Sequence, residues 1–461
     1  MDGSMTPQAP RLAGSAPPPA KPIWSLKRPD KRQNAMSQII QAAYEQPIVR
    51  HPSLIGPYYV VSGPEGVKRV LLDNVANYPK TEMERRFFSV IFGDGLASSE
   101  GETWRAHRRI MAPTFAPPSV AAYAPAMVEE ALAFRDHWDQ APAPIDVARD
   151  MSRLTLQIIA RTMFSTDGAA LATVMEEAIA GGMATLQVGL ADFIPGLATL
   201  RMRAREKRVA QVFARLDAVV AGLIAEREAH PGGDDLLARL IAARDGETGA
   251  AMSAREVRDQ MITIFLAGHE TTAAALAWIW YLLSQHPAEE AKLHAELDTV
   301  LAGRAPTHAD LERLPYARMV AEEAMRLYPP APGTSTRVAL AADEICGMKI
   351  PKGAFITVIP WVTHRHRALW DRPERFEPER FARAAQAERP RFAYLPFGGG
   401  PRVCIGANLA LTEMLLVLAT LAQRYQLALA PGHQVELKHQ ITLRPLGGLP
   451  MIVTRREPAA G

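Results

Sequence analysis

The sequence predicts a mainly α-helical protein with small β-sheets, and three observations lead to this fold class. The 461 residues contain no visible repeat and no linker composition in the middle of the chain. Strand-like stretches are few and short. Long segments carry apolar residues at helical spacing, and 255–283, which we expect to be the longest helix, is apolar nearly all round after its first turns.

The N-terminal stretch 1–35 is rich in Pro and Ala, carries scattered Lys and Arg, and lacks an apolar run. We expect a disordered tail that is neither a signal peptide nor a transmembrane anchor. Residues 36–461 are then expected to form one domain. The two cysteines, Cys346 and Cys404, lie far apart and fit a reducing cytoplasm rather than a disulfide framework. The net charge of +3 is small and does not support nucleic-acid binding.

Short apolar runs at 54–61 and 67–72 predict a small sheet and a helix. A glycine-containing loop, 94–101, then leads into a helix with Trp104 and Arg108. Because these two residues are four apart, they share one helix face. An indole N–H and a guanidinium that converge there can bind a pair of carboxylates. The alternative is an amphipathic helix with a solvated Arg cluster.

A core helix is predicted at 146–164, and long helical patterns follow over 175–228, interrupted at 193–196. The second of these patterns contains a cluster of basic residues: Arg201, Arg203, Arg205, Lys207 and Arg208. We expect a solvated helix face, because no strong apolar face accompanies the cluster to support binding at a membrane surface.

The apolar helix 255–283 is about 40 Å long and is expected to be buried. The polar sequence Gly-His-Glu-Thr-Thr at 268–272 interrupts it and argues against a bilayer span. Ala267 and Thr271 lie one turn apart, so a small side chain and a hydroxyl can face the same ligand. The alternative is a kink whose polar groups bond within the helix.

Glu323 and Arg326 form a Glu-x-x-Arg pair on a predicted helix, which ends before the prolines at 329–330. Strands are expected within 334–359, and a terminal hairpin within 440–453. Between these regions, the sequence Pro-Glu-Arg-Phe occurs twice, at 373–376 and at 378–381.

Glycines crowd the loop 397–406 on both sides of Cys404, and an apolar helix is expected at 408–421. The positive end of that helix lowers a nearby thiol's pKa, and a thiolate in a pocket rich in hydrogen-bond donors suits an iron ligand. The alternative is an inert, buried cysteine in a glycine turn.

This loop resembles the haem-binding loop of the cytochrome P450 family. The family pattern is matched in register by Phe397, Gly398, Gly400, Arg402, Cys404 and Gly406. Further family signatures occur in the expected order, at Trp104–Arg108, 267–272, Glu323–Arg326 and 378–381. The resemblance implies a fold in which haem lies between a long central helix and the Cys-bearing loop.

The resemblance also assigns roles. Cys404 would ligate the iron of haem b, with Phe397 and Gly406 in the same loop. Trp104, Arg108, Arg337 and Arg402 would lie near the propionates. Glu270 and Thr271, beside Ala267, would deliver protons to oxygen. Arg380, in the copy of Pro-Glu-Arg-Phe nearer the haem loop, would join Glu323 and Arg326 in a buried structural cluster.

The function implied is a haem-thiolate monooxygenase that hydroxylates an apolar organic substrate, using O2 and two externally supplied electrons. No flavin or iron–sulfur module fits after Gly461, so the electrons are expected from a separate donor, either ferredoxin with its reductase or a flavoprotein. Small residues at expected pocket positions, namely Ala97, Ala267, Ala331 and Thr334, hint at a roomy site for a fatty acyl chain, terpenoid or polycyclic compound. Two alternatives are a peroxide-using member of the family and a haem-thiolate binding or sensing protein without turnover. The Glu270–Thr271 pair favours the monooxygenase.

Overall fold

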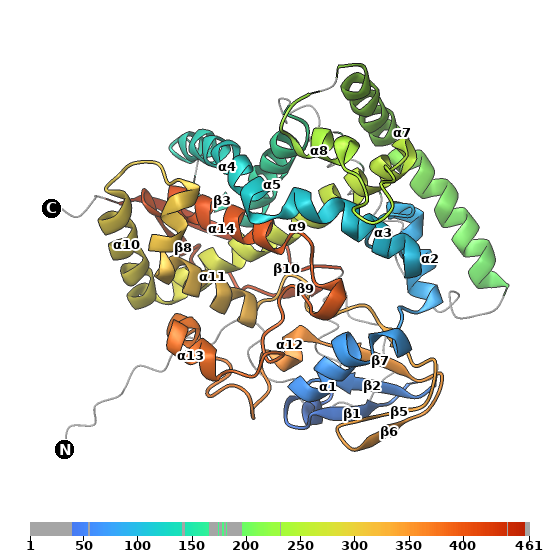
Figure 1. Cartoon of the computed structure of the whole chain (residues 1–461). Helices are drawn as coiled ribbons and strands as arrows, with labels where there is room; N and C mark the ends of the chain where they lie inside the picture. The colour runs from blue at the N-terminus through green and yellow to red at the C-terminus, as the bar shows by residue number, and fades with distance from the viewer. Residues whose placement is uncertain are drawn as a thin grey trace, which may run out of the picture.

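The computed structural model describes residues 39–53, 56–140, 143–165, 196–230, 232–439 and 441–456, and the single positions 174, 178 and 181. The expected disordered tail lies outside the described residues, as does most of the segment around the interruption at 193–196. Figure 1 shows a larger helical part and a smaller part built around a sheet. A mainly α-helical protein with small sheets is therefore confirmed.

The main helices are α1 Pro64–Lys68, α2 Glu82–Phe92, α3 Gly101–Met111, α4 Pro117–Trp138, α5 Val147–Phe164, α7 Leu197–Ala229, α8 Leu236–Ala242, α9 Ala254–Gln285, α10 Pro287–Leu301, α11 Pro315–Leu327, α12 Pro360–Thr363, α13 Arg383–Glu388 and α14 Ala407–Ala422. Short helical turns are η2 Gln41–Tyr44, η3 Arg69–Asp73, η4 Val75–Asn77, η5 Ala112–Phe115, η7 His308–Arg313, η8 Pro378–Phe381 and η9 Gly400–Arg402. The strands are β1 Ile48–His51, β2 Tyr58–Val61, β3 Ile145–Asp146, β4 Arg337–Val338, β5 Asp343–Ile345, β6 Met348–Ile350, β7 Phe355–Val358, β8 Tyr425–Leu429, β9 Leu437–His439, β10 Leu443–Pro445 and β11 Pro450–Arg455.

Helix α9 is the buried centre of the helical part and packs against α5, α11 and α14 (Figure 1). It begins at a capping box in which the Ser253 hydroxyl and the Glu256 carboxylate satisfy each other's backbone N–H groups. Its side chains from Val257 onward are mostly buried. By length and composition it is the only helix in the described part of the chain that could cross a membrane, but 72% of that apolar window is buried inside the protein. Burial on this scale is typical of a core helix.

The expectation that α9 is the longest helix is wrong, because α7 has 33 residues and α9 has 32. Helix α7 is rich in charged residues, and its continuous apolar run at 218–225 covers only part of its length. Its basic cluster is also less uniform than expected. The side chains of Arg201, Arg203, Lys207 and Arg208 are exposed, but Arg205 is buried.

Four sheets complete the fold, with strand orders β1-β2-β7-β4, β3-β11-β8, β5-β6 and β9-β10. The expected hairpin at 440–453 is only partly correct. Strand β10 forms an antiparallel pair with β9, the strand that precedes it, whereas β11 pairs with β8 and β3 in another sheet. A pattern of alternating residues indicates strands but does not identify their partners. The β9–β10 hairpin lies against α9.

Candidate active site

The Cys404 loop closes on itself through backbone hydrogen bonds. The Cys404 N–H donates to the Phe397 carbonyl at 2.9 Å, and the Val403 N–H donates to the Gly400 carbonyl at 3.1 Å. Gly398 and Gly400 have φ angles of +75° and +68°, which favour glycine. Helix α14 begins three residues after Cys404. The glycine spacing therefore determines the shape of this loop, as the sequence predicted.

Gly400 is also a point of very close approach between two distant segments. A Cβ at this position would lie 1.8 Å from the Leu71 carbonyl oxygen in η3. Because both contacting groups are backbone, no rotamer change relieves that clash. The segment after α1 therefore forms one wall of the Cys404 loop.

Burial raises the pKa of the Cys404 thiol, while the Gly406 N–H and the Arg108 guanidinium act in the opposite direction. The N–H at the start of α14 therefore acts in the direction expected of a helix N-terminus, but burial has the larger effect on this pKa. Cys404 nevertheless has accessible surface, although protein atoms surround its sulfur. The sulfur thus faces a space inside the molecule rather than its outer surface.

Helix α3 is tied to the Cys404 loop by both of its predicted site residues. The Arg402 guanidinium lies 4.2 Å from the centre of the Trp104 ring, and Arg108 Nη1 donates to the Val403 carbonyl at 2.8 Å. Arg402 also pairs with Glu100, just before α3. Burial lowers the pKa of Arg402 to about 10. Trp104, Arg108 and Arg402 are therefore neighbours, as the sequence predicted.

Arg337 in β4 joins this group of cations. It is 7% exposed, and its Nε has no hydrogen-bond partner among the described residues, although Nη1 lies 3.4 Å from the Tyr78 carbonyl. A guanidinium left in this state is costly unless an anion binds it. Sequence reasoning missed a further cation, Lys80, which forms a β-bridge with Arg337. Burial and the nearby Arg402 lower the Lys80 pKa to about 8.

The loop before α3 is held on the first turns of α9. The Asp259 carboxylate accepts from the Asp94 N–H at 2.9 Å, and the Gln260 side-chain oxygen accepts from the Leu96 N–H at 2.9 Å. Gly95 allows this approach, since a Cβ there would lie 2.0 Å from Thr263 Oγ1. These contacts fix α3 relative to α9.

Ala267 is exposed in the middle of α9, although most residues around it are buried. The Thr271 hydroxyl donates to the Ala267 carbonyl at 2.8 Å, so the two residues share one helix face as expected. This bond is the internal helix bond of the alternative interpretation, but the helix continues without a break. The lone pairs of Thr271 Oγ1 remain able to accept a hydrogen bond.

Glu270, the neighbouring acid, contacts the β9–β10 hairpin. Its Oε1 accepts from the Thr442 hydroxyl at 2.7 Å and lies 3.2 Å from Arg444 Nη1. Only 15% of the Glu270 side chain is exposed. These partners lie more than 170 positions away, and no local sequence signal indicates them.

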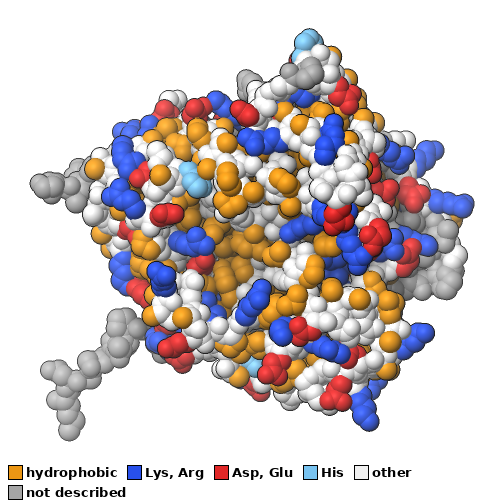
Figure 2. Space-filling model, viewed as in Figure 1, with side chains coloured by type: hydrophobic (Ala, Val, Ile, Leu, Met, Phe, Trp, Pro, Cys, Tyr) orange, Lys and Arg blue, Asp and Glu red, His pale blue; other side chains and the backbone are white. Residues whose placement is uncertain are grey.

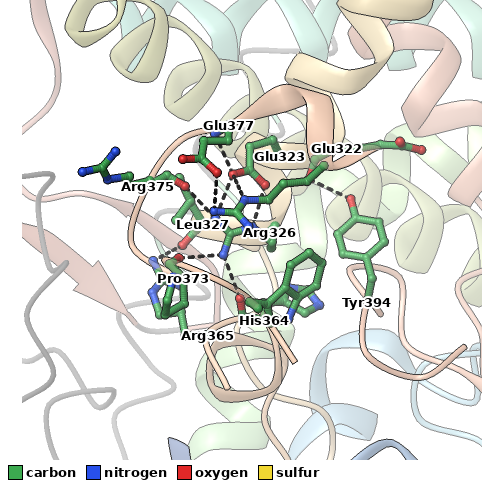
Figure 3. A network of polar contacts seen from close by, with 12 residues as sticks. Glu322, Glu323, Arg326, Leu327, His364, Arg365, Pro373, Arg375, Glu377 and Tyr394 are labelled. Atoms are coloured by element: carbon green, nitrogen blue, oxygen red, sulfur yellow. Dashed lines mark hydrogen bonds and ion pairs between the residues drawn. The ribbon is translucent and has the colours of Figure 1, made fainter. Parts of the chain in front are cut away.

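A network of buried polar contacts supports the segment that leads into the Cys404 loop (Figure 3). Arg326 makes two hydrogen bonds to the Glu323 carboxylate, at 2.6 and 2.8 Å, and donates to the His364 carbonyl at 2.8 Å. His364 Nε2 in turn accepts from the Leu395 N–H at 2.9 Å. Burial lowers the His364 pKa, so the neutral ring is favoured and can accept this bond. Tyr394 anchors the same segment by donating to the Glu322 carbonyl at 2.9 Å.

The structure distinguishes the two copies of Pro-Glu-Arg-Phe. Arg380 Nε lies 3.5 Å from Glu323 Oε1, and its Nη2 pairs with Glu377 at 2.6 Å. Arg375 is exposed and contributes only its backbone carbonyl to Arg326, with its guanidinium pointing away from the cluster in Figure 3. The choice of Arg380 is therefore confirmed.

A further buried acid, Glu413 in α14, went unnoticed in the sequence. It is 5% exposed, and its Oε1 has no partner among the described residues. Burial raises its pKa from 4.5 to about 8. Between pH 4.5 and about 8, the folded protein therefore keeps a proton on Glu413 that the unfolded chain has already lost.

Glu413 consequently makes a testable contribution to pH-dependent stability. Between pH 4.5 and 8 the folded state binds the extra proton, so this group's contribution to stability decreases as pH rises. This decrease in the free energy of unfolding is at most about 1.4 kcal/mol per pH unit, and we expect Glu413→Gln to remove it. The melting temperatures of the two proteins should diverge in favour of the variant from pH 5 to pH 8. A constant difference across this range would contradict the assignment.

The arrangement fits the expected haem. Cys404 and Ala267 both have accessible surface inside the fold, on the loop and on the central helix. Figure 2 shows a hollow in the middle of one face, lined mostly by hydrophobic side chains. The site also holds the cations Lys80, Arg108, Arg337 and Arg402, among which Arg337 lowers the pKa of both Lys80 and Arg402. A dianionic edge such as two propionates would relieve that repulsion and satisfy Arg337 Nε.

Comparisons with known proteins agree with this geometry. A family model described as Cytochrome P450 matches residues 16–449. Cyclooctatin synthase from Streptomyces melanosporofaciens is 38% identical over 84% of each chain. Cyclooctat-9-en-7-ol 5-monooxygenase from the same organism is 37% identical over 81% of each chain. The crystal structure of the cytochrome P450DA haem domain aligns with a TM-score of 0.80 at 28% identity, covering 89% of this chain and 90% of that one.

Proposed function

Because this chain belongs to the cytochrome P450 family, and is thus a haem-thiolate monooxygenase, we propose that it hydroxylates an apolar terpenoid. The observation that carries the proposal is the exposed Ala267 in the otherwise buried middle of α9, on a helix face that also presents Thr271. The apolar Ile441, next to the hairpin contact with Glu270, is 39% exposed. The names of the two Streptomyces relatives support a substrate of the cyclooctatin type, an unsaturated alcohol with a hydrocarbon skeleton.

The haem, when bound, supplies the activation of O2 with two electrons. In our proposal, the Cys404 thiolate would bind the haem iron, and Lys80, Arg108, Arg337 and Arg402 would bind the propionates. Trp104 acts indirectly, by holding the Arg402 guanidinium against its ring. Phe397 and Gly406 contribute backbone groups, because the Phe397 carbonyl and the Gly406 N–H fix the Cys404 main chain and sulfur.

The chain's own chemistry in the reaction is proton delivery. Glu270, partly exposed, exchanges protons with solvent, and Thr271 passes a proton into the pocket through its hydroxyl oxygen. For this step the hydroxyl releases the Ala267 carbonyl, to which it donates in the resting structure. The buried apolar residues around them exclude bulk water and therefore protect the reaction from unproductive proton leakage.

We expect Thr271→Ala to separate electron consumption from product formation. The variant should keep its haem content, carbon monoxide spectrum and substrate affinity, because none of these needs the proton. It should still consume NADH and O2 with a reconstituted donor, but release hydrogen peroxide in place of hydroxylated product. The loss of product per electron should be about 10²-fold or more.

Thr272→Ala is the matched control, because the Thr272 hydroxyl makes the same internal bond, to the Gly268 carbonyl at 2.9 Å, but its side chain is buried. If Thr271→Ala converts electrons to product as efficiently as wild type, the relay is refuted.

For the substrate class, a spin-state titration with cyclic terpenoid alcohols and with fatty acids is decisive. Tighter binding of the fatty acids would overturn the terpenoid proposal.

The electron donor and the location are also part of the proposal. We infer a separate donor, ferredoxin with its reductase or a flavoprotein, and a cytoplasmic location. Both cysteines are free thiols, which supports a reducing compartment. Measuring NADH-dependent reduction with each donor in turn identifies the one that supports turnover.

A further inference from the structure

The β9–β10 hairpin meets α9 at the residue that our proposed function makes the proton donor. Thr442 and Arg444 are two apart in an extended segment, so their side chains lie on the same face of the hairpin. Both contact the same atom, Glu270 Oε1, at 2.7 and 3.2 Å. Thr442 is 3% exposed, so its hydroxyl is dedicated to this contact rather than to solvent.

The backbone of the hairpin has a second attachment to the helical part of the protein. The Trp278 indole N–H donates to the Leu443 carbonyl at 2.9 Å, and the Leu443 N–H donates to the Pro330 carbonyl at 2.9 Å. The hairpin is therefore attached to α9 at Glu270 and again at Trp278, about 12 Å further along the helix. An attachment at two points prevents the strand from rotating and keeps Thr442 and Arg444 directed at the carboxylate.

Glu270 is otherwise free to take several side-chain conformations. A Glu side chain has several rotatable bonds, and ordering it costs up to about 2 kcal/mol. Two contacts on Oε1 select one conformation and leave Oε2 to exchange protons. Preorganisation of this kind is what a proton donor needs in order to act at a defined atom.

We propose that Thr442 and Arg444 are positioning residues, which hold Glu270 in the conformation that supplies protons to Thr271. The inference rests on the proposed relay. Its test therefore includes one measurement on the contact itself, made without turnover, and one on its consequence. Residues of the C-terminal hairpin thereby take part in the chemistry of the central helix without touching substrate or cofactor.

The first measurement is hydrogen exchange of the backbone amides in 437–445, on the haem-loaded protein without substrate. We expect exchange to rise in Glu270→Gln, Thr442→Val and Arg444→Gln. The matched control is Lys438→Gln. Lys438 lies directly opposite Arg444 in the β9–β10 register, and its side chain makes no hydrogen bond or ion pair within the described part of the chain. Unchanged exchange in all three variants would overturn the proposal, because a contact that orders neither of its partners could not hold Glu270 in one conformation.

The second measurement is the turnover rate and the peroxide released per NADH, with a reconstituted donor. Thr442→Val and Arg444→Gln should each slow turnover about three- to tenfold, with unchanged carbon monoxide spectra. Thr442→Ser and Arg444→Lys should recover most of the rate, and Lys438→Gln should match wild type. In a Glu270→Gln background, Thr442→Val should have no further effect, because both variants act through one carboxylate.

The outcomes separate the two proposals. If Glu270→Gln slows turnover but Thr442→Val and Arg444→Gln do not, the positioning role is wrong and the relay stands. If Glu270→Gln turns over like wild type, the relay itself fails, whatever the hydrogen exchange shows. Additive effects of Thr442→Val and Glu270→Gln would mean that Thr442 acts by another route, and would also overturn the inference.

Discussion

Cys404→Ala is expected to lose the red-shifted Soret band that the reduced, carbon monoxide-bound wild type shows. That band requires a thiolate ligand, and Cys404 is the cysteine whose sulfur lies inside the molecule, within the glycine-rich loop. The loss should be complete rather than partial, since neither the loop nor helix α3 places a second sulfur-bearing ligand there. The difference spectrum of purified protein measures it directly.

Cys346→Ala is the matched control. Cys346 lies in the β5–β6 turn with a φ of +48°, and it is exposed there. Alanine is no less suited than cysteine to that backbone, so the variant should keep both the band and the stability. If instead Cys404→Ala keeps the band and Cys346→Ala loses it, the assignment of the iron ligand is wrong.

Arg326→Ala is expected to lower the free energy of unfolding by about 3–5 kcal/mol, as the loss of one partner from a buried ion pair does. The Arg326 and Glu323 side chains are both fully buried. The substitution leaves the carboxylate without its two strongest bonds, and it leaves the His364, Pro373 and Arg375 carbonyls without their donor. Because His364 also holds Leu395, the damage should extend to the Cys404 loop. Thermal unfolding and haem retention after gel filtration measure both effects.

A graded series makes this prediction specific. Arg380→Ala should cost less than Arg326→Ala, because its nitrogen lies 3.5 Å from Glu323 and the carboxylate keeps its bonds to Arg326. Arg375→Ala, in the duplicate motif, should change stability by less than about 0.5 kcal/mol, since its guanidinium is exposed. An equal loss from Arg375→Ala and Arg380→Ala would show that the network is not the source of the stability.

The parts of the site that lie within one short segment could be predicted from the sequence. Local geometry follows directly from three patterns. The glycine spacing within 397–406 sets the shape of the loop. Trp104 and Arg108, like Ala267 and Thr271, are four residues apart and therefore share one helix face. Choosing Arg380 over Arg375 succeeded because nearness to the haem loop along the chain coincided with nearness in space. The family resemblance supplied the cofactor, which no local pattern identifies.

The remaining features depend on contacts between distant segments. Lys80 meets Arg337 through an isolated β-bridge between segments that are far apart in the sequence, and Thr442 meets Glu270 from a segment 172 positions further along the chain. The burial that raises the pKa of Cys404 comes from distant segments, so it is not visible in the sequence, whereas the helix end that acts against it is. The length of α7 was missed because charged residues interrupt its apolar pattern, whereas α9 is apolar over most of its length.

The contact between Gly400 and Leu71 has a consequence for recombining relatives of this protein. A Cβ at 400 would lie 1.8 Å from the Leu71 backbone oxygen in η3, so the backbones of two segments more than 300 positions apart must fit closely against each other. A chimera with a crossover between them joins a loop from one parent to a wall from the other. Chimeras that inherit 69–73 and 397–406 from the same parent should therefore yield haem-loaded protein more often than those that divide the two, even at equal overall identity.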